Sequence, residues 1–178
     1  PANAAVSTLP PCHYTFVVNV QDGRVNVHLT QRSGDIALGV PFNLAAYALL
    51  AQALAQRTDF TVGEFGHTIV AAHVYGGQGA RGEWYAAHLP ELQERLAAVE
   101  TRTAYRDVRD WLAETAPAEP ADESGYDHVP GLLEQLSREP RARPTLEIAD
   151  VPLDELRYDD VSLVEYDCAD GLSFAVAE

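Results

Sequence analysis

Residues 14–31 read Tyr-Thr-Phe-Val-Val-Asn-Val-Gln-Asp-Gly-Arg-Val-Asn-Val-His-Leu-Thr-Gln, and this stretch sets the architecture expected of the chain. Its two arms, residues 14–20 and 25–31, are rich in β-branched side chains, which favour strands. Asp22-Gly23 lies between them, a dipeptide typical of the two-residue turn in a β-hairpin because both positions accept a positive φ. The pattern therefore predicts two antiparallel strands joined by a tight turn.

The sequence after this hairpin predicts a loop, a helix and a third strand. Residues 32–42 contain several Gly and Pro residues and are expected to form a loop. Residues 43–57 are almost wholly apolar and rich in Ala and Leu, so they predict a long helix that is buried on most sides. Residues 67–75 predict the third strand. Farther along, the sequence predicts a helical stretch at 89–113, a loop at 115–127, a short amphipathic segment at 132–136, and strands at 145–149 and 161–166. These elements indicate an α+β fold in which a mixed sheet packs on the long buried helix.

Length and composition limit the class of protein. A chain of 178 residues, 47% of them hydrophobic, is long enough for one domain, or one domain and a subdomain, with a sizeable core. This composition argues against collagen-like, low-complexity and disordered classes. No apolar run approaches the roughly 18 residues of a membrane span. The chain begins at Pro1 without a basic and apolar leader, so it is expected to be processed, trimmed or a piece of a longer protein.

The chain is strongly acidic. Asp and Glu number 27 against 12 Arg and no Lys, which gives a formal net charge of −15. Nucleic-acid and anionic-membrane binding are therefore disfavoured, because phosphate contacts need clustered cations. Two interpretations of the charge stay open: a salt-in halophile whose carboxylates keep the surface hydrated, and a high-GC genome that prefers Arg codons. Cys12 and Cys168 could pair in principle, but they form no CxxC zinc spacing, and a reduced, cytoplasmic setting is expected.

Short motifs of chemical interest follow one another along the first half of the chain. They are Pro11-Cys12-His13, Gln31-Arg32-Ser33-Gly34-Asp35, Leu38-Gly39-Val40-Pro41-Phe42-Asn43 with Tyr47, and His73-Val74-Tyr75; Gln135-Leu136-Ser137-Arg138-Glu139-Pro140 comes later. In this order and spacing they resemble the folate-dependent thymidylate synthase family. The resemblance implies a thymidylate synthase-like α+β fold, an obligate homodimer, and the reductive methylation of dUMP to dTMP. It implies 5,10-methylenetetrahydrofolate as the donor of both carbon and hydride, and no metal.

The resemblance also implies a role for particular residues. Cys12 is the expected nucleophile that adds to C6 of uracil, and Arg32 is expected to bind the phosphate and stabilise the Cys12 thiolate. With Asn43, these two are the expected catalytic residues. The expected substrate contacts are His13, Gln31, Arg32, Ser33, Asp35, Asn43, His73 and Tyr75. The expected folate contacts are Asp35, Leu38, Gly39, Phe42 and Ala177, with the C-terminal residues closing over the folate.

Asn43 bears most directly on the choice of base. A carboxamide can accept a hydrogen bond from uracil N3–H and donate one to O4 at the same time. The deoxycytidylate hydroxymethylases, which are similar to this family, carry Asp at the matching place, so Asn43 favours dUMP. A structural role for Asn43, as a helix N-cap after Pro41-Phe42, is compatible with this assignment.

Two alternative functions stay open at this point. One is a pyrimidine-nucleotide hydroxymethylase, in which water rather than hydride ends the reaction. The other is a truncated, non-catalytic homologue that serves in nucleotide binding or dimerisation. The sequence departs from the family at Val70-Ala71-Ala72, where Gly-Asp-Thr is usual, and at His67-Thr68-Ile69, which replaces Trp-Thr-Gly.

The resemblance suggests three segments. Residues 1–75 are expected to form the catalytic core with the nucleophile and nucleotide contacts, residues 76–127 a family-atypical insertion, and residues 128–178 the C-terminal part of the same domain. Family members carry further active-site segments before the nucleophile, so the chain is expected to be the C-terminal part of a longer enzyme. The remaining histidines and cysteine are expected to be surface or structural residues: His28, His67, His88, His128 and Cys168.

Overall fold

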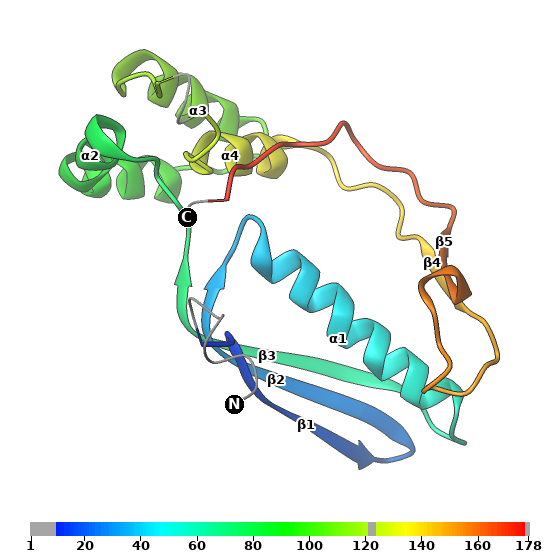
Figure 1. Ribbon diagram of the computed structural model, residues 1–178. Coiled ribbons are helices and arrows are strands. Elements are labelled where there is room, and N and C mark those ends of the chain that lie inside the picture. Colours follow the sequence, from blue (N-terminus) through cyan, green and yellow to red (C-terminus); the bar gives the residue numbers. More distant parts are fainter. Residues whose placement is uncertain (1–9, 121–123, 177–178) are drawn as a thin grey trace. The chain divides into compact units, whose positions relative to one another are not determined.

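The computed structural model describes residues 10–120 and 124–176 (Figure 1). The chain divides into two compact units. The first unit comprises the residues up to His73 together with Ile148–Ser162, and the second comprises Val74–Glu147 together with the residues from Leu163 onward. The segments 1–75, 76–127 and 128–178 inferred from the sequence are not tested by this division and stay a prediction.

The predicted hairpin is confirmed. Strands β1 (His13–Gln21) and β2 (Arg24–Asp35) pair in antiparallel fashion, with Val18 opposite Val27. Asp22 and Gly23 have φ values of 51° and 73°, which is the conformation of a type I′ turn. The turn therefore fixes the register of the two strands, and this register sets which side chains share a face of the sheet.

Strand β3 (Thr61–His73) completes a three-stranded mixed sheet by pairing with β2 in parallel. Helix α1 (Gly39–Gln56) makes the crossover that a parallel connection needs. The loop predicted at residues 32–42 is wrong at both ends, since β2 continues to Asp35 and α1 begins at Gly39. The helix can begin this early because Pro41 lies in its first turn, where the missing N–H leaves no bond unmade.

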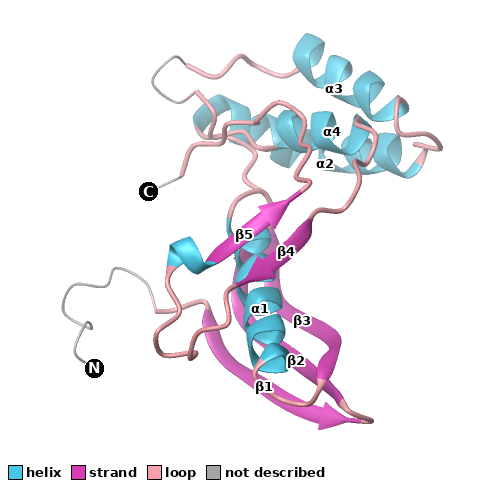
Figure 2. Cartoon of the chain, turned by 90° about the vertical axis from the view of Figure 1, so that its right-hand side faces the viewer, coloured by secondary structure: helices cyan, strands magenta, loops and turns pink. Residues whose placement is uncertain are grey.

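Helix α1 lies across one face of the sheet (Figure 1, Figure 2). Val25 and Val27 of β2 form a core with Ala51 and Ala55 of the helix. The prediction that α1 is buried on most sides is wrong within this chain, because a single sheet covers only one side of a helix. Residues on its other sides are exposed, among them Leu44 and Phe42.

The segment after residue 147 returns to the end of α1. Gln56 Nε2 donates to the Ile148 carbonyl at 2.9 Å, and Arg57 Nε donates to the Val151 carbonyl at 2.7 Å. Strands β4 (Thr145–Ile148) and β5 (Val161–Val164) pair as a separate two-stranded sheet, with the short 3-10 helix η2 (Tyr158–Asp160) before β5. The sequence predicts both strands, at residues 145–149 and 161–166, and each observed strand ends slightly earlier.

The second unit is helical. Helices α2 (Gly79–Ala97), α3 (Ala104–Thr115) and α4 (Val129–Ser137) share a core of five buried side chains. These are Tyr85, Leu92, Val108, Leu112 and Leu133. The single helical stretch predicted at residues 89–113 is wrong, because the chain turns between α2 and α3. The hydroxyls of Thr101 and Thr103 bond one another there at 3.2 Å, and such hydroxyls favour turns over helix interiors.

The segments just before α2 and just before α4 pair with each other and form a short bridge. Gly76 pairs with Asp127, Gly77 N donates to the Tyr126 carbonyl at 3.3 Å, and His128 N donates to the Tyr75 carbonyl at 2.9 Å. Behind the bridge, Arg81 and Asp127 form a buried ion pair at 2.7 Å, and the Tyr85 hydroxyl donates to the same carboxylate at 2.9 Å. Among the helices that the structure describes, none is long and apolar enough to cross a membrane.

Candidate active site

Cys12, the predicted nucleophile, lies immediately before β1. It is opposite Arg32 of β2, which is predicted to bind the phosphate. Arg32 N donates to the Cys12 carbonyl at 2.9 Å, which extends the hairpin ladder by one bond. The register of the ladder shifts between His13 and Thr15, and such bulges are common beside active sites because they redirect side chains. Cys12 is half-buried and is a free thiol. The hairpin therefore brings the two motifs together although 19 residues separate them in the sequence.

Among the described residues, the Arg32 guanidinium finds only part of its hydrogen-bond partners. Its Nη2 donates to the Pro10 carbonyl at 2.6 Å. Its Nε is buried and has no hydrogen-bond partner among the residues that the structure describes. Buried polar groups are nearly always paired, so an orphaned guanidinium N–H suits a site that an anionic ligand completes.

Gln31 links the sheet to helix α1 through its side chain. The residue is buried, with 1% of its surface exposed. Gln31 Nε2 donates to Asn43 Oδ1 at 2.9 Å, and Gln31 Oε1 accepts a hydrogen bond from His67 Nε2. Asn43 lies inside α1, whose N-cap position is Leu38, so the N-cap role considered for Asn43 is wrong. Its side chain is instead part of a hydrogen-bonded series that runs from β3 through β2 to α1.

Aromatic side chains pack beside this series. The Tyr47 hydroxyl lies 3.4 Å from His13 Nδ1, and its ring stacks on Phe65 at a centroid distance of 6.2 Å. His67 lies next to Phe65 on β3, with the ring centroids 5.7 Å apart. Burial is the main factor that lowers the pKa of His67, followed by the nearby charges of His13 and His28. The imidazole of His67 is therefore favoured in its neutral form.

A second group of polar residues lies at the carboxyl ends of β2 and β3. Ser33 Oγ lies 3.5 Å from His73 Nδ1, and Asp35 is the register partner of His73. The Asp35 carboxylate accepts from Ala37 N at 2.9 Å, which closes the turn into α1. Residues 31, 33 and 35 of β2 and residue 43 of α1 thus approach one side of the sheet, whereas the alternation of side chains directs Arg32 to the other face.

The predicted folate contacts are only partly assembled in the described chain. Leu38, Gly39 and Phe42 lie at the start of α1, and Phe42 is 74% exposed. Tyr75, a predicted substrate contact, lies in the second unit, next to the His128 ring. Ala177 lies outside the described residues. Within the described chain, no group of three or more His, Cys, Asp or Glu side chains is arranged to hold a metal ion.

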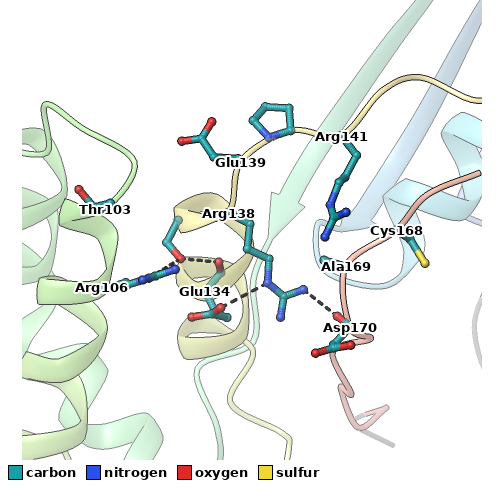
Figure 3. A pocket seen from close by; sticks show the side chains of 11 residues that line it. Thr103, Arg106, Glu134, Arg138, Glu139, Arg141, Cys168, Ala169 and Asp170 are labelled. Atoms are coloured by element: carbon teal, nitrogen blue, oxygen red, sulfur yellow. Dashed lines mark hydrogen bonds and ion pairs between the residues drawn. The ribbon is translucent and has the colours of Figure 1, made fainter.

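The second unit contains two hollows whose walls, among the described residues, include none of the predicted site residues. The first, of about 580 Å³, lies between α3, α4 and the C-terminal tail (Figure 3). Two of its arginines are matched by acids, since Arg138 Nε lies 3.3 Å from Glu134 and Arg141 Nη1 lies 2.6 Å from Asp167, and Arg106 Nε donates to the Ser137 hydroxyl at 3.2 Å. The second, of about 460 Å³, is lined mainly by leucines of α2 and α4. Neither hollow competes with the hairpin as the candidate active site.

The sequence analysis assigned His67 to a surface or structural role. The structure instead links its side chain to Gln31 in the candidate site. A signal was present in the sequence, because residues 65, 67, 69, 71 and 73 of one strand share a face with the predicted nucleotide contact His73. The other histidines have different surroundings. His28 bonds Thr68 at 2.9 Å, His88 lies 2.9 Å from the Trp84 carbonyl, and His128 is fully buried.

Comparisons with known proteins show which family the chain resembles. A family model described as thymidylate synthase matches residues 1–178. The chain is 67% identical over its whole length to a protein of Haloferax volcanii named thymidylate synthase. It covers 52% of that relative, so the chain spans about half the length of the curated relative it matches.

Proposed function

Because this chain belongs to the thymidylate synthase family, we propose that it carries the nucleophile of an enzyme that converts dUMP to dTMP. The observation that carries the proposal is the pairing of the Cys12 segment with the Arg32 segment, by the 2.9 Å bond between their backbones. The pairing gives a half-buried thiol and an incompletely paired guanidinium at one end of the hairpin. A cysteine nucleophile needs this kind of cationic neighbourhood, because the thiolate is the reactive form.

The chemistry proposed for Cys12 is covalent catalysis. Its thiolate forms a bond from Sγ to C6 of uracil, and the electron pair of the C5–C6 double bond moves toward C5 and O4 as an enolate. C5 then becomes nucleophilic enough to form a bond to a one-carbon unit. Loss of the C5 proton breaks the bond from the new carbon to the nitrogen of the folate donor and leaves an exocyclic methylene on C5. Addition of a hydride to that methylene returns the electron pair to the ring, which restores the C5–C6 double bond and expels the Cys12 thiolate. 5,10-Methylenetetrahydrofolate, when bound, supplies both the carbon and the hydride.

The residues around α1 fit the two ligands. Asn43 presents an oxygen and an amino group, which match N3–H and O4 of uracil. The exposed Phe42 ring and Leu38 give an apolar surface suited to a flat pterin, and the Asp35 carboxylate has lone pairs for more than one donor. Ser33 and His73 lie together where a nucleotide hydroxyl or phosphate could bond both.

We also propose that the protein is a homodimer. Among the described residues of the first unit, no helix or strand covers the sheet face opposite α1, and this face carries Val17 and Val70 with 58% and 73% of their surfaces exposed. Exposed apolar side chains on a flat sheet are typical of a protein interface. A second copy of the chain packed on this face would cover them.

The experiment that tests the proposal is the trapping of a covalent adduct in the complete gene product. Incubation with 5-fluoro-dUMP and 5,10-methylenetetrahydrofolate should give a mass increase on the wild type and on Cys168→Ala, whose thiol is exposed and belongs to the second unit. Cys12→Ala should give no adduct and no dTMP, while its circular dichroism spectrum stays that of the wild type. An adduct that survives in Cys12→Ala would show that Cys12 is not the nucleophile.

A further inference from the structure

We propose that His67 is a positioning residue that sets the base preference of this protein, by holding the side-chain amides of Gln31 and Asn43 in one orientation. The inference rests on the proposed function, because it takes Asn43 to face the uracil ring. His67 does not need to touch the nucleotide for this role. It acts through Gln31, whose side chain lies between His67 and Asn43.

The orientation of the Gln31 amide follows from its partners. Gln31 Nε2 lies 3.5 Å from the Ser33 carbonyl, and a backbone carbonyl only accepts hydrogen bonds. The amino end of Gln31 must therefore lie on the side of Ser33 and Asn43, which places its Oε1 toward His67. An amide oxygen also only accepts, so His67 Nε2 must carry a proton and donate it to Gln31.

The orientation of the Asn43 amide follows in turn. Gln31 Nε2 donates to Asn43 Oδ1 at 2.9 Å, and the reversed amide would set two amino groups against each other. Asn43 Oδ1 keeps a second lone pair, and its Nδ2 keeps its donors. Asn43 thus offers one acceptor and one donor, which is the complement of N3–H and O4 of uracil. Cytosine offers an acceptor at N3 and a donor at N4, which is the complement of the reversed amide.

His67 is held for this task by its neighbours. The Phe65 ring packs beside it, and Gln31 is almost fully buried, so water cannot easily replace the imidazole as a donor to Oε1. The charged and titratable groups near His67 are His13 on β1 and His28 on β2. Without the His67 donor, Gln31 Oε1 would be buried and unpaired, and the long 3.5 Å contact with the Ser33 carbonyl would be the main contact still favouring the present rotation of the Gln31 amide, so the reversed rotation would become more populated.

The test compares three variants in the complete gene product. His67→Leu removes the donor, His67→Gln keeps a side-chain N–H, and His88→Leu removes a histidine from α2 as the matched control. The dissociation constants of dUMP and dCMP are measured by titration calorimetry, which needs no turnover. We expect the preference for dUMP over dCMP to fall by about 5- to 30-fold in His67→Leu, and to stay near the wild-type value in His67→Gln and in His88→Leu.

The outcomes separate this inference from the proposed function. A wild type that binds no dUMP, or binds dCMP as well as dUMP, would count against the proposed function and the inference together. A wild type that prefers dUMP, with the same preference in His67→Leu, would overturn the inference alone. An equal loss in His67→Gln and His67→Leu would also overturn it, because ring packing rather than the donated proton would then matter.

A measurement on the wild type guards against a variant that fails to fold. In the long-range ¹H–¹⁵N spectrum of histidine-labelled protein, the pattern of cross-peaks distinguishes a neutral ring protonated on Nε2 from one protonated on Nδ1. The inference requires the Nε2–H tautomer for neutral His67. Detection of the Nδ1–H tautomer would overturn it, because His67 Nε2 could not then donate to Gln31.

Discussion

Replacing Arg81 with methionine tests how strongly the helical unit depends on one buried ion pair. The Arg81 and Asp127 side chains are 9% and 1% exposed, and Arg81 Nε and Nη2 approach Asp127 Oδ2 at 2.8 and 2.7 Å. Tyr85 donates to the same oxygen, and burial, followed by the Asp127 charge, raises the pKa of its phenol, so the donor stays protonated. Methionine keeps the aliphatic stem but leaves the Asp127 carboxylate without its counter-charge.

The structure gives the expected magnitude. Removal of one partner from a buried pair costs about 3–5 kcal/mol of unfolding free energy, because the other charge stays buried and unpaired. For a chain of this length that corresponds to a fall in melting temperature of about 6–20 °C. Arg141→Met is the matched control, since the Arg141–Asp167 pair has 52% and 65% of its side-chain surfaces exposed. An exposed pair contributes about 0–1 kcal/mol, so this variant should unfold close to the wild type.

The assay is thermal unfolding followed by circular dichroism at the helix band, at low salt and in about 1 M salt, where the Debye length is about 3 Å. Both variants lose one cation, so they change the overall repulsion of the acidic chain equally. Salt should reduce the effect of Arg141→Met and leave most of the effect of Arg81→Met, because the buried pair is poorly screened. A melting temperature for Arg81→Met equal to that for Arg141→Met would refute the argument from burial.

Other expectations follow from the charge, the helical insert and His67. The net charge is −15, so salt should screen the repulsion between carboxylates, and the melting temperature should rise steeply from low to molar salt. Such behaviour would fit the similarity to a protein of Haloferax volcanii. A melting temperature that does not change with salt would favour codon bias as the origin of the composition. Replacing residues 78–125 with a short Gly-Ser linker should lower the helix content but retain dUMP binding in calorimetry, because all predicted nucleotide contacts except Tyr75 lie in the first unit. Lost binding would make the insert part of the site. The folded state lowers the pKa of His67, so its neutral form stabilises the fold above about pH 6.5, and this contribution is lost as the pH falls through the lowered pKa. Melting temperatures measured down from neutral pH should therefore fall less in His67→Gln than in the wild type, and parallel curves would contradict this.

The elements that the sequence predicted well are those fixed by local chemistry. The Asp22-Gly23 turn specifies its own backbone conformation, and the two strands follow from it. The start of β3 was missed because Gly63 and Gly66 argue against a strand when they are read locally. The structure shows that these residues continue a parallel ladder, in which Val62 lies opposite Val25 and Phe65 opposite Val27. Pairing over such a distance in the sequence outweighs the local preference of two glycines.

The sequence predicts which residues form the candidate site, but not the hydrogen bonds that join them. Motifs placed Cys12, Gln31, Arg32 and Asn43 near one another, and the structure gives the hydrogen bonds between their segments. The bond from His67 to Gln31 depends on the parallel register of β2 and β3, which sets His67 opposite Leu29. No local pattern encodes that register. The burial of α1 was overestimated for a related reason, since composition shows that a helix is apolar but not how many of its sides the chain covers.

The sheet also implies an order of events in time. A hairpin closes in about 1–10 μs, so β1 and β2 can bring the Cys12 and Arg32 segments together early in folding. Strand β3 pairs with β2 across the segment that contains α1, and parallel pairing over such a long connection is intrinsically slow. We therefore expect the amides of β2 that face β1 to become protected in pulse-labelled hydrogen exchange before those of β3. The predicted nucleophile Cys12 would meet Arg32 first, and His67 and His73 would arrive later with β3.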